Sequence, residues 1–184
     1  MVPPEYQTFF LASAGASAAL IGLLFVGVSI DPVRVFGEKA DPRREAQAVS
    51  AFSALVNAFF ISMTSLIPGI IVGLVVTIVA VASSLQLLGL LARVGPDRGG
   101  LVPTLRGGFL FLASAAIYGT ELYLGIVLWT RPSETAALTG LLEVLLGAYA
   151  IGLGRAWQLM GAPRIGLLSF ALDLIERART RTRG

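Results

Sequence analysis

Two glutamates lie deep inside long apolar stretches of the sequence. Glu121 falls within the stretch 107–130 and Glu143 within the stretch 135–160. A carboxylate at the centre of a membrane span costs about 2.5–3.5 kcal/mol, so it usually faces a partner or a water-filled path. Both glutamates lie at nearly equal distances from the polar turn 131–134, so antiparallel helices would carry them at one depth. Because like charges held close together cannot both ionise cheaply, we expect the pair to share one proton or one cation.

Other polar side chains fall at the same depth when each is counted from the nearest outer turn. Asn57 and Thr77 flank Pro68 at similar distances, and Ser17 lies equally far into the first apolar stretch, with Ser13 one turn before it. A purely structural polar layer is the alternative, since depth does not fix rotation about a helix axis. The sequence predicts an ion or proton pathway lined by Glu121, Glu143, Asn57, Ser17, Thr77 and Ser13.

Residues that most enzymes and metal sites require are missing from the sequence. The chain has no His and no Cys, which excludes a Ser-His-Asp triad and a thiolate metal site. It also has no glycine-rich phosphate loop followed by Lys and Ser or Thr. We therefore expect no enzyme activity, no catalytic residue, no metal and no cofactor. The basic residues are spread along one membrane side, so nucleic acid is not an expected partner.

The composition identifies the solvent in which these residues must be positioned. Of the 184 residues 55% are hydrophobic and 14% are charged, against about a quarter charged in soluble domains. A bilayer core about 30 Å thick needs about 20 helical residues. The sequence predicts an all-α membrane protein with five transmembrane helices over about 6–30, 46–66, 69–92, 107–130 and 135–160. Residues 1–163 would form the transmembrane domain, and 164–184 a cytoplasmic amphipathic helix with an Arg-rich tail.

The second and third spans come from one uncharged stretch, 46–92, that is too long for a single crossing. Pro68-Gly69 lies near its middle and predicts a tight hairpin of two spans; one long kinked helix is the alternative. With five spans, Arg131 is the only basic residue on the outer side, as the positive-inside rule favours. We expect the N-terminus outside and the C-terminus in the cytoplasm. The Arg, Ala, Leu and Gly usage is typical of a high-GC genome and favours a bacterial inner (plasma) membrane.

A stripe of small residues runs along the first span at helical spacing. Such stripes allow a second helix to approach closely, so we expect a homo-oligomer embedded in membrane lipids. The stripe consists of Ala12, Gly15, Ala19 and Gly22. Two functions remain open on this evidence: an oligomeric channel or pathway for a proton or monovalent cation, and a non-transporting accessory or assembly subunit that docks partner proteins.

Overall fold

The computed structural model describes residues 2–37, 42–94 and 101–159, and within these ranges it is all-helical, with no strand. Five helices are long and apolar enough to cross a membrane, which confirms an all-α, multi-pass membrane protein. The predicted C-terminal amphipathic helix lies outside the described residues. The elements are α1 (Pro4–Ile30), α2 (Pro32–Phe36), α3 (Pro42–Ser65), α4 (Val72–Val94), α5 (Leu101–Thr130) and α6 (Thr135–Leu159).

Helix α3 is the most deeply buried of the five long helices. It contacts α1, α4 and α6. In its most apolar stretch 56% of the residues are buried, against 22–33% in the other four spans. α5 completes the arrangement by packing against both α4 and α6. The outer helices therefore present large apolar surfaces outward, as expected for helices in contact with lipid.

Prolines and one glycine mark the start of α1 and the breaks between α1 and α2 and between α3 and α4. Pro4 stands at the start of α1, where its missing N–H costs nothing. α1 ends at Ile30, just before Asp31-Pro32, because the residue preceding a proline is disfavoured in the helical conformation. The connection 66–71 between α3 and α4 contains Gly69 at φ +79°, a conformation that favours glycine.

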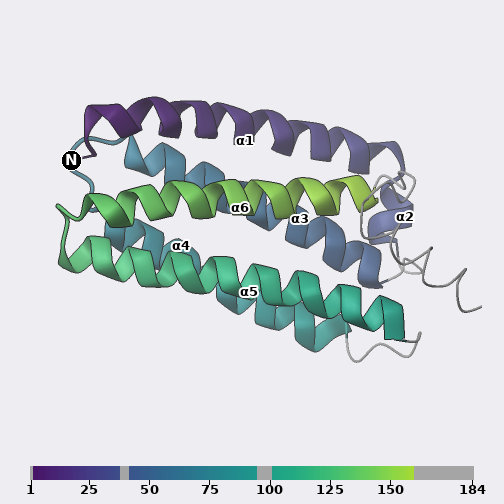
Figure 1. Cartoon of the computed structure of the whole chain (residues 1–184). Coiled ribbons are helices and arrows are strands. Elements are labelled where there is room, and N and C mark those ends of the chain that lie inside the picture. The colour runs from purple at the N-terminus through teal and green to yellow at the C-terminus, as the bar shows by residue number, and fades with distance from the viewer. Residues whose placement is uncertain (1, 38–41, 95–100, 160–184) are drawn as a thin grey trace, which may run out of the picture.

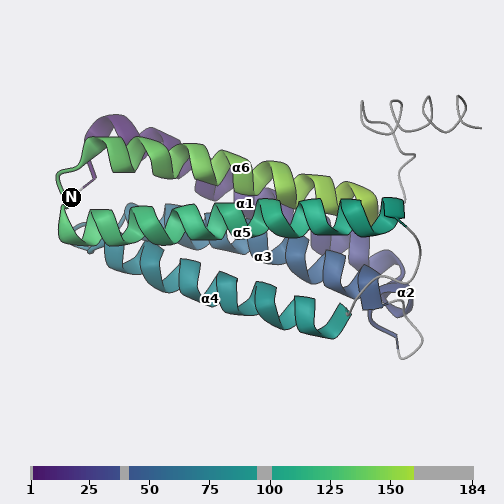
Figure 2. The same cartoon turned by 60° about the horizontal axis from the view of Figure 1, so that its bottom comes forward.

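The chain places its loops at two opposite ends of the bundle. The N-terminus and the loops 66–71 and 131–134 gather at one end, which we call the N-terminal end (Figure 1). Helix α2 and the ends of α4 and α6 that lead into the other connections lie at the opposite end, which we call the α2 end (Figures 1 and 2).

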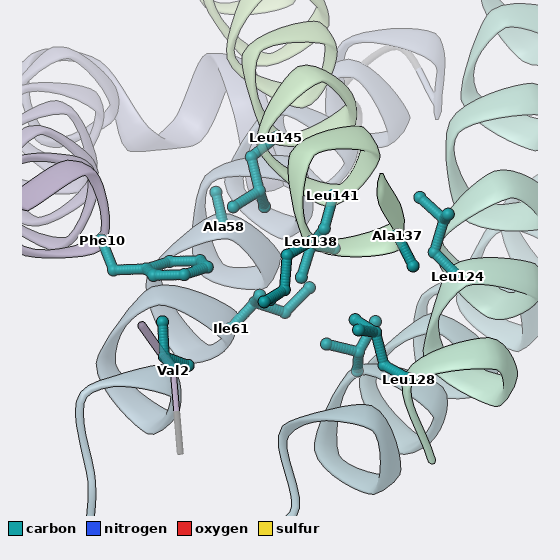
Figure 3. Close-up of a cluster of buried hydrophobic side chains, with 11 residues drawn as sticks. Val2, Phe10, Ala58, Ile61, Leu124, Leu128, Ala137, Leu138, Leu141 and Leu145 are labelled. Carbon is teal, nitrogen blue, oxygen red and sulfur yellow. The ribbon is translucent and has the colours of Figure 1, made fainter. Parts of the chain in front are cut away.

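The main apolar core fills the half of the bundle nearer the N-terminal end. Side chains from α1, α3 and α6 point toward one another there, with Phe10, Ile61 and Leu141 fully buried (Figure 3). Val76 of α4 and Leu128 of α5 belong to the same cluster. A smaller cluster lies closer to the α2 end and consists of Leu24, Ala51, Leu55 and Ala156.

Candidate functional site

Glu121 is fully buried between helices, at 0% exposure. Its Oε2 accepts a hydrogen bond of 2.8 Å from Nδ2 of Asn57 on α3. The same Nδ2 donates to Oγ of Ser83 on α4, at 3.1 Å. Three helices thus contribute one side chain each to a buried polar cluster, which we call the Glu121 cluster.

Two oxygen atoms of the Glu121 cluster have no hydrogen-bond partner among the described residues. They are Oε1 of Glu121 and Oδ1 of Asn57, and both are buried. Both atoms are acceptors when the glutamate is ionised, so the cluster then lacks a donor. A buried polar atom left without a partner costs about 1–3 kcal/mol. A proton or a cation at this position would supply what is missing.

Glycines let α4 and α5 approach closely between the Glu121 cluster and the N-terminal end of the bundle. A Cβ atom added at Gly125 would lie 2.7 Å from Oγ1 of Thr77, and one added at Gly73 would overlap the backbone of Leu128 and Trp129. Thr77 donates to the carbonyl of Gly73 on its own helix, at 2.7 Å. Thr77 is therefore a packing residue at the α4–α5 contact, and the structure does not bring it to Glu121.

The structure also does not bring Glu143 to Glu121. The buried face of α6 is formed by Leu138, Leu141, Leu145 and Ala148. Glu143 stands two residues from both Leu141 and Leu145, about half a turn away, and its side chain is exposed. The two glutamates share a depth, as counted from the turn 131–134, but α6 is rotated so that Glu143 faces outward. A shared proton between them is therefore not supported within one chain.

Ser13 and Ser17 belong to a separate cluster of hydroxyl groups between α1, α3 and α6. The Tyr149 hydroxyl lies 2.7 Å from Oγ of Ser13 and 2.6 Å from Oγ of Ser17, and it donates to the backbone carbonyl of Ser13. Oγ of Ser13 also lies 2.7 Å from Oγ of Ser62 on α3. These groups satisfy one another, so the hydroxyl cluster holds α1 against the bundle and is separate from Glu121.

A line of polar groups continues from Glu121 toward the α2 end along one face of α5. Ser114, Tyr118 and Glu121 follow at spacings of four and three residues, and all three are buried. Arg155 of α6, also buried, donates from Nη2 to Oγ of Ser114 at 2.8 Å. Tyr118 lies within the electrostatic influence of both Glu121 and Arg155.

A shallow groove lies beside this polar line and is lined by residues of α3, α4 and α5. Ser83 belongs to both the groove and the Glu121 cluster, and Tyr118 lines the groove from α5. The groove is too narrow to enclose a water molecule. Its other lining residues are Ser50, Ser53, Gln86, Leu87 and Leu90.

Sequence reasoning did not identify Ser83, Ser114, Tyr149 or Arg155 as parts of these clusters. Helical spacing offered a signal for α5, because Ser114 and Tyr118 share a face with Glu121. It offered a similar signal for α6, where the leucines at 138, 141 and 145 mark the core face and place Glu143 opposite. No spacing rule predicts that Tyr149 meets Ser13, because that contact joins two helices that are remote in sequence.

The small-residue stripe of α1 faces away from the bundle. Ala12, Gly15, Ala19 and Gly22 are all exposed, and a Cβ added at either glycine would meet no atom within 4 Å. The buried residues of α1, among them Phe10, lie on the opposite side of the helix. Among the described residues, no other helix therefore packs against the stripe at Gly15 or Gly22.

No protein family, curated protein or solved structure matches this chain.

Proposed function

We propose that this membrane protein provides a pathway for protons or monovalent cations, with Glu121 as the ion-binding group. The observation that carries the proposal is the complete burial of Glu121, whose Oε1, like Oδ1 of Asn57, has no donor among the described residues. An ionisable group inside a membrane bundle is expensive and commonly marks an ion or proton route. A purely structural role would be served better by a neutral side chain, which avoids the cost of burying a charge.

Access to Glu121 is proposed from the α2 end. The groove includes Ser83 of the Glu121 cluster, and it is also lined by Gln86 and Leu90, which follow Ser83 along α4 toward the α2 end. On the other side the route meets the apolar core around Ile61, Val76 and Leu128. Because the groove is too narrow for enclosed water, transport requires that α4 and α5 separate further or that a second subunit completes the path.

We propose that the working unit is a homo-oligomer in a bacterial inner membrane. The outward-facing stripe at Gly15 and Gly22 supports this, because small residues allow close helix contacts. The positive-inside rule supports a cytoplasmic α2 end, since the loops 66–71 and 131–134 at the opposite end contain only Arg131 as a basic residue. The turn at Gly69 and the short connection 66–71 support a tight hairpin of α3 and α4, and 164–184 is proposed as a cytoplasmic amphipathic helix.

A non-enzymatic accessory or assembly subunit is the second candidate function. The same exposed stripe favours it, because the helix it would accept could belong to a different protein. In that case the Glu121 cluster would only orient α3, α4 and α5 relative to one another. The two candidates differ in whether the purified chain alone transports an ion.

Flux measurements in liposomes test the proposal. The purified protein is reconstituted and the flux of protons, K⁺ and Na⁺ is recorded separately for wild type and for Glu121→Gln. We expect wild type to carry at least one of these ions and Glu121→Gln to reduce that flux to the level of protein-free liposomes. Wild-type flux that persists in Glu121→Gln would contradict the role of Glu121. Absence of any flux in wild type would favour the accessory subunit.

A further inference from the structure

We propose that Glu121 and Asn57 form a proton-binding pair, in which Glu121 carries the proton and the ion taken by this site is H⁺. The inference rests on the proposed function in treating the Glu121 cluster as the ion site, and it names the ion. A carboxylic acid and a carboxamide are complementary: the amide N–H donates to the acid, and the acid O–H donates in return.

Half of this complementary arrangement is present in the hydrogen bonds of the structure. Nδ2 of Asn57 donates to Oε2 of Glu121 at 2.8 Å. The remaining oxygen of each side chain, Oε1 of Glu121 and Oδ1 of Asn57, is buried without a partner among the described residues. One proton on Oε1 turns an acceptor into a donor and removes the charge of the carboxylate at the same time.

A metal cation fits the same site poorly. Ca²⁺ takes six to eight oxygen ligands, whereas the side-chain oxygens of the Glu121 cluster come only from Glu121, Asn57 and Ser83. Transporters that bind Na⁺ inside the membrane gain carbonyl ligands from unwound helices. Here α3, α4 and α5 run as continuous helices past the site, so their carbonyls are bonded within each helix. In the described ranges, no three acidic side chains come together as a metal group.

The side chains around Glu121 also favour neutralisation of its carboxylate by a proton over neutralisation by a positively charged side chain. From α3 and α4 the site receives Asn57 and Ser83, which are uncharged. From α5 the titratable neighbour is Tyr118, and from α6 the charged group is Arg155, which acts on Tyr118 and donates to Ser114 two turns away from Glu121. The hydrogen bond that Glu121 receives among the described residues comes from the neutral amide of Asn57. A proton therefore neutralises Glu121 most directly.

Infrared spectroscopy of the purified protein in lipid tests this inference without relying on transport. Wild type should show the carbonyl stretch of a protonated carboxylic acid at neutral pH, and the band should shift in D₂O. The band should be lost in Glu121→Gln and kept in Glu143→Gln, a control of the same residue type at matched depth. Asn57→Leu should shift the band, because the acid loses its amide partner. A wild type without this band at neutral pH would overturn the inference.

A second measurement keeps the test decisive if Glu121→Gln fails to fold. The thermal unfolding of wild type is followed while Na⁺, K⁺ or Li⁺ replaces choline at constant ionic strength. A proton-binding pair predicts no change in the melting temperature. A melting temperature that rises with one of these cations, both in wild type and in Glu143→Gln, would overturn the inference. The infrared band without any ion flux in liposomes would leave the inference standing and contradict the proposed function. Flux of a cation without the infrared band would contradict the inference and leave the proposed function standing.

Discussion

Glu121 and Glu143 are chemically identical side chains with opposite surroundings. Glu121 is enclosed by α3, α4 and its own helix, and Glu143 is exposed on the outer face of α6. The difference comes from rotation: Glu121 shares a face with Ser114 and Tyr118, whereas Glu143 lies half a turn from the leucines that α6 buries. Burial, and not residue type or depth, decides which carboxylate can act as an internal ion site.

The hydroxyl cluster that joins α1 to α3 and α6 can be tested by removing the hydroxyl of Tyr149. Tyr149→Phe removes a hydroxyl that contacts Ser13 and Ser17 and leaves the packing of the ring in place. We expect a loss of about 1 kcal/mol in the free energy of unfolding, within the range of hydrogen bonds between membrane helices. Tyr123→Phe is the matched control, because Tyr123 is 66% exposed. Unfolding titrations in bicelles that give equal stabilities for the two variants would contradict this role of Tyr149.

Sequence reasoning identified part of the site. It placed Asn57 and Glu121 at one depth by counting residues from Pro68 and from the turn 131–134, and the structure joins them by a hydrogen bond. Counting residues measures position along a helix axis, so it also grouped Glu143, Thr77 and Ser17 with them. Those side chains point elsewhere because rotation depends on packing with other helices.

Helices α3 and α5 extend beyond the apolar spans that predict them. α3 begins at Pro42 and α5 at Leu101, several residues before the predicted spans at 46 and 107. Hydropathy marks the part of a helix that lies in lipid, whereas a helix continues as long as its residues favour it. The short helix α2 was not predicted, because a segment of this length carries no periodic signal.

The close contact of α4 and α5 can be tested by adding a methyl group at Gly125. Gly125→Ala places a Cβ 2.7–2.8 Å from Oγ1 and N of Thr77, so one helix must shift. We expect a loss of about 1–3 kcal/mol in the free energy of unfolding, as for other overpacked sites. Gly119→Ala on the same helix is the control, because its Cβ meets no atom within 4 Å. The contact would be shown unimportant if the two variants unfolded at the same denaturant concentration.

The two ends of the bundle differ in charge. The N-terminal end carries the loops 66–71 and 131–134, with Arg131 as their one basic residue, and the α2 end leads into the basic connections. The number of spans and this sidedness follow from composition and charge, which the sequence states directly. How the five long helices pack against one another could not be deduced, because all five spans are apolar.

The sidedness can be measured directly because the chain contains no cysteine. Single cysteines are introduced at Ser133, in the exposed loop at the N-terminal end, and at Val33, which is 74% exposed in α2. An impermeant thiol reagent applied to intact cells should label Ser133→Cys and leave Val33→Cys unlabelled until the membrane is opened. Labelling of Val33→Cys alone from outside would reverse the proposed orientation.

Comparing Glu121→Gln with Glu143→Gln in the same flux assay separates the buried carboxylate from the exposed one. Each substitution removes one carboxylate at the same depth, and only Glu121 is buried in the bundle. We predict that Glu143→Gln keeps the wild-type rate, while Glu121→Gln falls to the rate of protein-free liposomes. An equal loss in both variants, or wild-type rates in both, would contradict Glu121 as the ion-binding group.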